Sequence, residues 1–498
     1  MKILLATGLF PPDIGGPATY SKLLCDELPK EGIDVDVLSF GSVRRLPKVI
    51  RHVSYALKLL WHARTADAIF AQDTVSVGFP ALIASYILGK TFMVRIPGDY
   101  AWEQAMQRFG VTDSVDDFQS KRYGLRIELL RWVQRLVVEQ ADQAIAPSRY
   151  FAKLANGWLK NGDKVIAVYN GIDTSDIVKL GTSGAFEPKT IISAGRLVPW
   201  KGFEMLIHAM KRLPGWKLSI AGDGPKMQEL QDIIAREGLS GRVTMLGRVK
   251  SEDLLVMISR SEIFALNTGF ESFSFQIVYA MAAGAPIITT SIGDIPEIID
   301  DGQSGILIAP DDEAGFVAAV GRISSDPGLR RRLVDEGRKK AAMFSIEKTA
   351  GVVAKIVTDL RTDPSPSKKR RTLAAKLVRY LFSGGTAAVT DLVLLYVFTD
   401  ICHIWYLVSS VLAFLVAFGV SFVLQKFFTF QDHGTEGMHR QAMIYFAVTS
   451  TNLVLNTGLI YLFVQYTGMN YIIAQIVTSI LIAIESYLVY QAFIFKKS

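Results

Sequence analysis

The chain has 498 residues, of which 50% are hydrophobic and 20% are charged, and its formal net charge is +7. This length is sufficient for about three domains, and the composition excludes a disordered or fibrous protein. The mean hydropathy of +0.28 is unusual for a purely soluble protein. The cysteines, Cys25 and Cys402, lie too far apart in the chain to form a disulfide framework.

Most of the positive charge lies in one short segment. Residues 361–379 contain seven basic residues and one acidic residue, a net +6 of the +7 of the whole chain. A nucleic-acid function, which needs a broad basic face, therefore has little support. The segment also separates two kinds of sequence, because 1–360 mixes charged, Gly and Pro residues whereas the chain from about Tyr380 is almost continuously apolar.

Short apolar runs alternate with helical patterns through the first 170 residues. The apolar run at the start ends at Pro11-Pro12, so we interpret it as a buried strand rather than a signal peptide. Further strands are expected at 34–39, 68–71, 91–96, 143–146 and 165–169. The alternation predicts a doubly wound domain with a parallel sheet over 1–170.

A second series of the same kind follows over 171–360. Its strands are expected at 190–194, 217–221, 243–246, 263–266, 286–290 and 305–308, and helices ending with 346–360 would close the domain. The predicted fold class is therefore α/β, with two tandem Rossmann-like domains followed by an all-α membrane domain. Ligands of such sheets bind beyond the carboxyl ends of the strands, so we expect a site in the cleft between the two domains.

The segment 44–61 has no acidic residue and a helical apolar repeat. The repeat consists of Ile50, Val53, Leu57, Leu60 and Trp61. A helix of this kind either lies on an anionic membrane or packs its apolar side on the sheet, and the sequence does not decide between these two alternatives.

Two elements of the second domain contain residue types that bind anions. Arg196 and Lys201 lie between a strand and a helix, where cations and free amide groups can hold a diphosphate. Glu271 comes just before a helix whose open amides would be those of Phe273, Ser274 and Phe275. The alternatives are a solvated surface for the two cations and a simple helix cap for Glu271.

Four segments beyond residue 376 are long and apolar enough to cross a bilayer: 377–398, 405–424, 442–464 and 471–490. The basic clusters fall on one side of this arrangement, which predicts that both termini are cytoplasmic. A shift of 65 residues aligns Tyr380 with Tyr445 and Ser421 with Ser486. This indicates two parallel copies of a two-helix unit, unless the similarity of the apolar helices is due to chance.

Three polar residues fall inside the predicted spans, namely Asp391, Asn456 and Glu485. They form helix–helix hydrogen bonds or contact a polar lipid head group. The segment 381–391 and the aromatic run 422–430 resemble the GtrA-like family, whose members are four-span proteins associated with polyprenyl-phosphate-linked sugars. The composition predicts a basic Pro/Ser linker over 361–376. The resemblance implies a GtrA-like domain over 377–498, which moves a lipid carrier or only anchors the chain.

Residues 1–360 resemble the retaining glycosyltransferases of family 4, which have the GT-B fold. The motifs are Gly15-Gly16, Ala146-Pro-Ser148, Asn170-Gly-Ile-Asp173, Gly195-Arg196, Lys201-Gly202, Gly222-Asp-Gly-Pro225, Leu246-Gly-Arg-Val249 and the segment that starts at Glu271.

The resemblance implies a role for each of these motifs. Arg196 and Lys201 would hold the donor diphosphate, together with Gly15, Gly16 and the helix amides of Phe273, Ser274 and Phe275. Arg248 and Val249 would lie beside the nucleoside, and Glu271 would contact the donor sugar.

One position departs from the family pattern. The second Glu of the family motif, which holds the ribose, is replaced by Tyr279, and a tyrosine cannot give a bidentate carboxylate contact. In the first domain Asp99 follows a strand, where family members often place a residue near the reacting carbon. Asp99 is therefore a candidate catalytic residue beside Glu271, with a turn-stabilising Asp as the alternative.

The sequence thus predicts a membrane-integral retaining glycosyltransferase, with its transferase part in the cytoplasm. It would move a sugar from a nucleotide-diphosphate donor to a lipid-linked or membrane-proximal acceptor in cell-surface glycan synthesis. No cofactor is expected, and no His/Cys/Asp cluster has the spacing of metal ligands. The alternative, which Tyr279 keeps open, is a lipid-carrier translocase or anchor whose transferase part has lost catalysis. The donor base and sugar, the acceptor and the oligomeric state do not follow from the sequence.

Overall fold

The computed structural model describes residues 1–13, 15–160, 162–173, 177, 186–362, 367–430, 432, 434, 438–469, 471–490 and 494. The chain forms two compact units, residues 1–365 and 366–498, and each unit is considered by itself. The side chains of the predicted linker, 361–376, lie outside the described residues.

The first sheet is parallel throughout and has the strand order β2-β1-β3-β4-β5-β6. Its strands are β1 (Lys2–Thr7), β2 (Asp34–Ser39), β3 (Ala68–Ala71), β4 (Thr91–Arg95), β5 (Gln143–Ala146) and β6 (Val165–Ala167). The central strands read as continuous apolar runs because helices cover both faces of the sheet.

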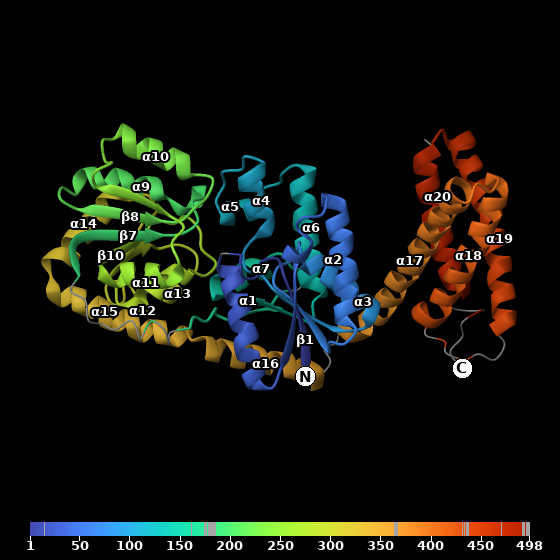
Figure 1. The fold of residues 1–498 in the computed structure, drawn as a ribbon, viewed down its shortest axis with the longest axis horizontal. Helices are drawn as coiled ribbons and strands as arrows, with labels where there is room; N and C mark the ends of the chain where they lie inside the picture. Colours follow the sequence, from blue (N-terminus) through green and yellow to red (C-terminus); the bar gives the residue numbers. More distant parts are fainter. Residues whose placement is uncertain are drawn as a thin grey trace. The chain divides into compact units, whose positions relative to one another are not determined.

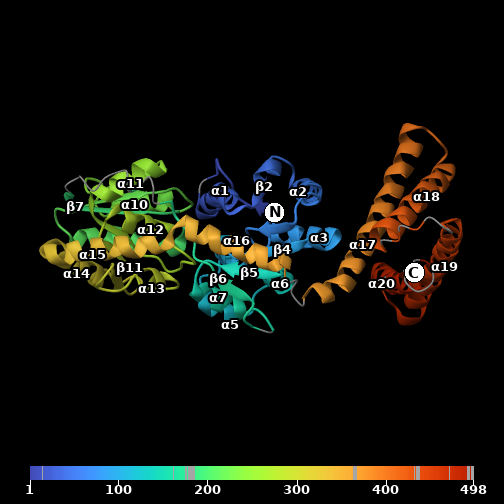
Figure 2. The same ribbon diagram turned by 90° about the horizontal axis from the view of Figure 1, so that it is seen from below.

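Seven helices belong to this first domain: α1 (Gly16–Glu27), α2 (Lys48–Ala63), α3 (Gly78–Leu88), α4 (Tyr100–Arg108), α5 (Val115–Ser120), α6 (Leu125–Gln140) and α7 (Arg149–Asn156). α3 contacts both α2 and α6, and it also packs on β3 and β4. These three helices therefore form one layer on the sheet (Figures 1 and 2).

The second sheet is also parallel, with the order β12-β11-β10-β7-β8-β9. Its strands are β7 (Glu187–Ala194), β8 (Lys217–Ala221), β9 (Val243–Gly247), β10 (Ser261–Leu266), β11 (Ile287–Thr290) and β12 (Ile306–Ile308). The helices are α9 (Phe203–Ala209), α10 (Met227–Arg236), α11 (Ser251–Arg260), α12 (Phe275–Ala283), α13 (Ile295–Ile298), α14 (Glu313–Ser325) and α15 (Pro327–Ala341). The two tandem Rossmann-like domains are thus confirmed, and the ends of the strands differ from the prediction by three residues or fewer.

The expectation that the helix over 346–360 closes the second domain is wrong. α16 (Ile346–Thr362) contacts α1 and the 3-10 turn Leu28–Glu31 of the first domain (Figure 1). Its Val353 and Val357 share a core cluster with Ile3 and Leu24. The physical reason is that α1 alone does not cover this face of the first sheet, so the chain returns to bury it.

The second unit is helical, with α17 (Ser367–Tyr396), α18 (Tyr406–Val423), α19 (Met438–Thr467) and α20 (Tyr471–Val489). π-helical turns follow α17 at Val397–Ile401 and α18 at Leu424–Thr429. Among the described residues, the helical stretches Val378–Ile401, Val411–Thr429 and Met438–Thr467 are long and apolar enough to cross a membrane. The fourth predicted span coincides with α20, but many of its side chains, including 471–476, lie outside the described residues.

The two helical hairpins of this unit, α17–α18 and α19–α20, correspond to the two copies of the predicted repeat. The aligned tyrosines both lie in the aromatic core: the ring centre of Tyr380 is 5.6 Å from that of Tyr487, and that of Tyr445 is 4.7 Å from that of Tyr490. The hydroxyl groups of Tyr445 and Ser421 form a hydrogen bond of 2.7 Å.

The polar residues predicted inside the spans are half-buried: Asp391 on α17, Asn456 on α19 and Glu485 on α20. The membrane unit also contains a fully buried charged residue, Lys426, that the sequence analysis did not single out. Lys426 donates hydrogen bonds to Asp432 at 2.7 Å and to Gln441 at 2.8 Å, and Gln441 donates to Asp432 at 3.0 Å.

Candidate active site

The loop after β7 carries both predicted cations. It runs from Gly195 through a 3-10 turn, Pro199–Lys201, to α9. Gly202 has a left-handed backbone with φ of 56°, and a Cβ atom there would lie 2.1 Å from the carbonyl oxygen of Asn267. Only glycine permits this close approach, which holds Lys201 against the loop that follows β10.

Lys201 and Glu271 lie together where the second domain faces the first, a region here called the cleft. The Lys201 ammonium donates to a carboxylate oxygen of Glu271, and both side chains are largely buried. The two loops are joined by the amide of Gly269, which donates to the carbonyl oxygen of Trp200 at 2.7 Å. A buried ion pair of this kind is costly to break without a replacement for each charge.

Arg196 lies on the exposed side of the same loop, with its guanidinium 5.7 Å from the ring centre of Trp200. A carboxylate of the first domain also faces these cations. Burial raises the pKa of Glu103 on α4, while the positive charges of Arg196 and Lys201 oppose this shift. The sequence reasoning did not select Glu103, although it stands in the first turn of a helix just after β4.

The start of α12 forms the floor of this region. The side chains of Phe273 and Phe275 are buried in the core, with ring centres 5.5 Å apart, so only backbone groups from these positions can reach an anion. Ser274 is the N-cap residue, and no partner is found for its buried hydroxyl in the described part of the chain. A helix leaves its first amides without internal partners, which makes this end a site for negative charge.

The glycine loop of the first domain reaches the same helix. A Cβ atom on Gly16 would lie 3.0 Å from Cδ2 of Phe275, so the bare backbone at this position allows the two domains to approach closely. Gly15 is the N-cap of α1 and has a φ of 142°. The two glycines therefore bring the N-terminus of α1 next to the N-terminus of α12, and both helix ends favour an anion between them.

The residues predicted to lie near the nucleoside differ in exposure. Arg248 is exposed and donates from Nε to Asp223 at 2.8 Å, which lowers the pKa of that carboxyl. Val249 packs against the core cluster. The ring of Tyr279 stacks on that of Phe275 at 6.5 Å, and burial raises the pKa of Tyr279 to about 12. Tyr279 is therefore neutral at physiological pH and offers a hydroxyl group, not a carboxylate.

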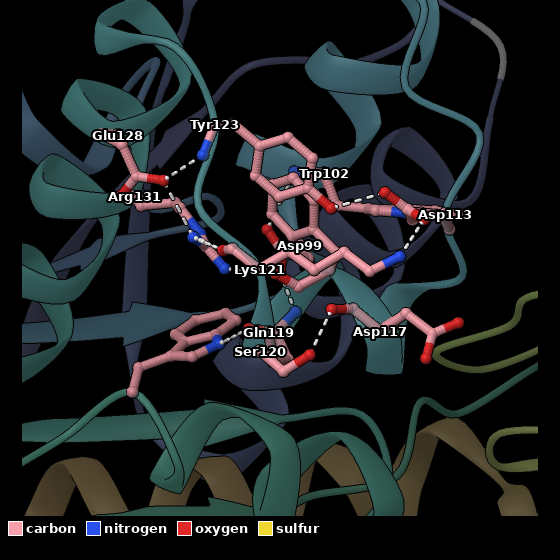
Figure 3. A network of polar contacts seen from close by, with 12 residues as sticks. Asp99, Trp102, Asp113, Asp117, Gln119, Ser120, Lys121, Tyr123, Glu128 and Arg131 are labelled. Carbon is pink, nitrogen blue, oxygen red and sulfur yellow. Dashed lines mark hydrogen bonds and ion pairs between the residues drawn. The ribbon is translucent and has the colours of Figure 1, made fainter.

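Asp99 lies in a polar network of the first domain, shown in Figure 3. It caps α4 by accepting from the amide of Trp102 at 3.1 Å, and it also accepts from Gln119 at 2.9 Å and Gln134 at 3.1 Å. Burial raises its pKa, and these hydrogen bonds oppose the rise. The contacts are those of the alternative interpretation, a turn-stabilising aspartate, and a catalytic role for Asp99 stays a prediction.

Asp99 also lines a cavity of about 670 Å³ in the first domain. The walls come from α5, α6 and α7 and include Gln119, Trp132, Tyr150 and Trp158. Tyr150 reaches toward the second domain, because a Cβ atom on Gly293 would lie 3.5 Å from its Cε1 atom. The cavity therefore borders the loop that follows β11.

The end of that loop and the short helix α13 carry two acidic residues that the sequence reasoning missed, Asp294 and Glu297. Glu297 accepts from the amides of Arg149 at 3.0 Å and Tyr150 at 2.6 Å, and from the hydroxyl of Tyr169. It thus links the second domain to the N-terminus of α7. Asp294 is completely buried, and its oxygens have no hydrogen-bond partner among the described residues. Burial and the nearby charge of Glu271 raise the pKa of Asp294 well above its usual range.

A metal centre was not found among the residues that the structure describes, since no group of three or more His, Cys, Asp or Glu side chains is placed to hold an ion. The charged groups of the cleft are instead Arg196, Lys201, Glu103 and Glu271, supported by two helix N-termini.

Comparison with known families agrees with the division of the chain into two Rossmann-like domains and a helical membrane unit. Residues 14–176 match the model of Glycosyltransferase Family 4, residues 183–340 match Glycosyl transferases group 1, and residues 379–495 match the GtrA/DPMS transmembrane domain.

Individual proteins are similar to part of the chain. An uncharacterized glycosyltransferase of Methanocaldococcus jannaschii is 26% identical over 68% of this chain and 93% of its own length. The lipopolysaccharide core biosynthesis glycosyltransferase LpsE of Rhizobium meliloti is 31% identical over 37% of this chain, and the match spans about half of that relative, 53%. The structure of Anabaena HepE in complex with UDP-glucose superposes with a TM-score of 0.57, at 20% identity, over 72% of this chain and all of that chain. The chain is therefore a glycosyltransferase with two Rossmann-like domains in the GT-B arrangement, joined to a GtrA/DPMS transmembrane domain that places it at a membrane.

Proposed function

We propose that the protein transfers a sugar, with retention of anomeric configuration, from a nucleoside-diphosphate donor to a lipid-linked acceptor in cell-surface glycan synthesis. The observation that carries this proposal is the convergence of Lys201, Glu271 and the N-terminus of α12 in one cleft. HepE, whose structure holds UDP-glucose, supports the class of donor. The lipopolysaccharide enzyme LpsE and the transmembrane domain support a lipid-linked acceptor.

In this proposal the ion pair between Lys201 and Glu271 is exchanged when the donor binds. Lys201 turns to the diphosphate, and Glu271 accepts hydrogen bonds from hydroxyl groups of the donor sugar. Arg196 and the amides at the start of α12, at Phe273, Ser274 and Phe275, complete the diphosphate site, with Gly15 and Gly16 opposite. Each buried charge thereby gains a new partner, so the exchange avoids the cost of an isolated charge.

The transfer itself needs positioning and charge stabilisation. The bond between the anomeric carbon and the diphosphate oxygen breaks, and its electron pair stays on the diphosphate. The acceptor oxygen forms the new bond on the same face of the sugar, and its proton passes to the departing phosphate oxygen. Arg196, Lys201 and the helix amides stabilise the negative charge that develops, so neither a covalent intermediate nor a bound metal is required by this mechanism.

The nucleoside in this proposal lies beside the backbone of Arg248 and Val249, with Tyr279 near the ribose. Tyr279 supplies one hydrogen bond where the family has a carboxylate, so we expect weaker ribose binding. The second candidate function, a lipid-carrier translocase or anchor without transferase activity, rests on this position.

The membrane part of the proposal concerns topology. We propose that the transmembrane domain crosses the inner or plasma membrane several times, with both termini and the transferase domains in the cytoplasm, where sugar nucleotides are made. Its half-buried polar residues, Asp391, Asn456 and Glu485, are the candidate contacts for a polyprenyl phosphate.

The test uses the purified full-length chain in lipid nanodiscs and a set of sugar nucleotides. Release of nucleoside diphosphate is measured with and without a polyprenyl-phosphate acceptor. We expect release with one donor class, and a loss of about 100-fold or more in the Glu271→Gln variant. Lys339→Ala is the matched control, because Lys339 pairs with Glu336 on the exposed surface of α15. Binding of the lipid carrier without any turnover would favour the translocase, and unchanged turnover in Glu271→Gln would refute the site.

A further inference from the structure

The outer side of α2 is apolar and faces solvent. Four large side chains follow one another along it and are more than half exposed: Ile50 (54%), Val53 (55%), Leu57 (57%) and Trp61 (69%). The side of α2 that packs on the domain is made by Tyr55, Leu59 and Ala63, which are buried. The sequence left open whether the repeat of 44–61 packs on the sheet, and the structure places these four residues away from it.

These four residues form one continuous stripe, which we call the α2 stripe. Their spacing of three and four residues brings successive side chains to one face of a helix. Soluble monomers rarely leave large apolar side chains contiguous on the surface, and such patches mark a binding surface. The stripe therefore requires an occupant.

The charges beside the stripe identify the occupant. Arg45, Lys58 and Arg64 are exposed, and no acidic residue occurs between Asp36 and Asp67. Trp61 lies within the last turn, with the guanidinium of Arg64 5.1 Å from its ring centre. Exposed apolar residues, a Trp and flanking cations on one helix are typical of segments that lie in the interface of an anionic bilayer.

The same layer of helices has further exposed apolar side chains on α6. α3, which contacts α2, has no charged residue. On α6, which contacts α3, the side chains of Leu125, Leu129 and Trp132 are exposed by 86%, 56% and 55%. No residue of α3 is exposed, so the apolar groups that this layer presents to solvent come from the α2 stripe and from α6.

The chain itself keeps this layer near a bilayer. α16 ends at Thr362 and the first candidate span begins at Val378. The intervening 15 residues reach no farther than about 50 Å when fully extended. Lipid is therefore present at a high effective concentration, and a face of modest intrinsic affinity is sufficient to bind it.

We propose that the α2 stripe lies in the surface of the anionic leaflet of the membrane that carries the transmembrane domain, with Ile50, Val53, Leu57 and Trp61 at the level of the acyl chains. Lys58 and Arg64 contact the lipid phosphates. The first domain is then held to the bilayer at a second point, separate from the spans. This inference rests on membrane location and not on the choice of donor.

The experiment measures the surroundings of one residue of the stripe in the full-length chain. Cys25 and Cys402 are replaced by Ser, and Leu57→Cys is labelled with a polarity-sensitive dye in nanodiscs of neutral or anionic lipid. Gln231→Cys, on the exposed polar side of α10, is the matched control. We expect the emission at position 57 to shift to shorter wavelength and to be quenched by nitroxide-labelled lipid, more strongly with anionic lipid, whereas position 231 is unaffected.

Two further variants make the result decisive. Lys58→Glu with Arg64→Glu should abolish the preference for anionic lipid, and high salt should weaken it, because salt screens exposed charges. Ser substitutions at all four stripe positions should remove a nitroxide-quenching signal at Gly41→Cys, in the adjoining 3-10 turn, while donor hydrolysis remains. Equal quenching at 57 and 231 would overturn the proposal. A dye shift in lipid-free detergent that grows with protein concentration would also overturn it, and would assign the stripe to a second copy of the chain. A missing turnover with intact quenching would contradict the proposed function alone.

Discussion

The cleft and the membrane unit each contain a lysine paired with an acidic residue, and the two pairs differ in whether the surrounding polar groups are also paired. Lys426 is fully buried and donates to both Asp432 and Gln441, while Gln441 donates to the same aspartate. Lys201 pairs with Glu271 in a region that also contains the guanidinium of Arg196 and the buried carboxyl groups of Glu103 and Asp294.

The difference separates a structural pair from a functional one. Lys426 and Asp432 bind each other, and Gln441 binds both, so a ligand would gain little by entering. Around Lys201 there are more acidic and basic side chains than there are ion pairs between them. A charged ligand can therefore replace Glu271 as the partner of Lys201. The first arrangement stabilises a fold, whereas the second holds charges ready for a substrate.

The largest expected effect is on the stability of the membrane unit. In Lys426→Met the carboxylate of Asp432 loses its cation, and breaking a buried pair from one side costs about 3–5 kcal/mol. We expect a marked loss of folded protein in a thermal unfolding assay in detergent. Turnover per folded molecule should stay unchanged. Arg440→Met, at an exposed position of α19, is the control, and equal stability of both variants would show that the Lys426 network is not structural.

Lys201→Met tests whether the pair in the cleft serves turnover. The variant removes one positive group from the developing diphosphate charge, and turnover should fall by about 10²–10³-fold. The unfolding temperature of the donor-free variant should fall as well, because Glu271 loses its cation, so turnover per folded molecule is the quantity that separates this variant from Lys426→Met. Steady-state kinetics and thermal unfolding of the same preparation provide both values. A variant that unfolds early and keeps its turnover would reverse the assignment of the two pairs.

Glu297→Gln weakens the contact between the domains. Glu297 accepts from the amides of Arg149 and Tyr150 and from the hydroxyl of Tyr169, and hydrogen bonds to a charged group contribute about 1.5–3 kcal/mol each. An amide accepts with only one oxygen, so we expect a higher KM for the donor with a smaller change in kcat. Glu336→Gln on α15 is the exposed control. An unchanged KM would show that this contact does not align the cleft.

Asp294→Asn should have the smallest effect, and its sign depends on pH. Because burial raises the pKa of Asp294 in the folded state, the unfolded chain loses this proton at lower pH than the folded chain. The contribution of Asp294 to stability is therefore present below the unfolded pKa and is lost as pH rises above it. We expect Asp294→Asn to be more stable than the parent at pH 8 and nearly equal at pH 4, as measured by urea unfolding. A constant difference at both pH values would contradict the shift.

The sequence was sufficient for the parts of the fold that depend on local pattern. Buried parallel strands such as β3 and β8 appear as apolar runs between helical segments, so their positions could be predicted within a few residues. Lys201 and Glu271 could be paired because both follow strands whose carboxyl ends meet at one edge of the sheet. The resemblance to a family then supplied their roles.

Other features depend on contacts between distant segments. Glu297 binds amides about 150 residues earlier in the chain, and Glu103 faces cations from the other domain, so neither has a local signal. The apolar repeat of α2 could be detected, but periodicity does not say which side of a helix is buried. Tyr55 and Leu59 occupy the inner side and leave Leu57 outside.

The return of α16 to the first sheet has a mechanical consequence. The polypeptide passes between the two Rossmann-like domains twice, once after β6 and again before α16. The two segments are hydrogen-bonded to each other: the amide of Ile172 donates to the carbonyl oxygen of Phe344, and the amide of Ile346 donates to that of Ile172. The two crossings lie side by side, so the domains are joined by two paired segments and not by a single linker. The membrane spans follow α16 in the sequence, so the chain leaves the transferase from its N-terminal domain and not from the domain that carries Arg196 and Lys201.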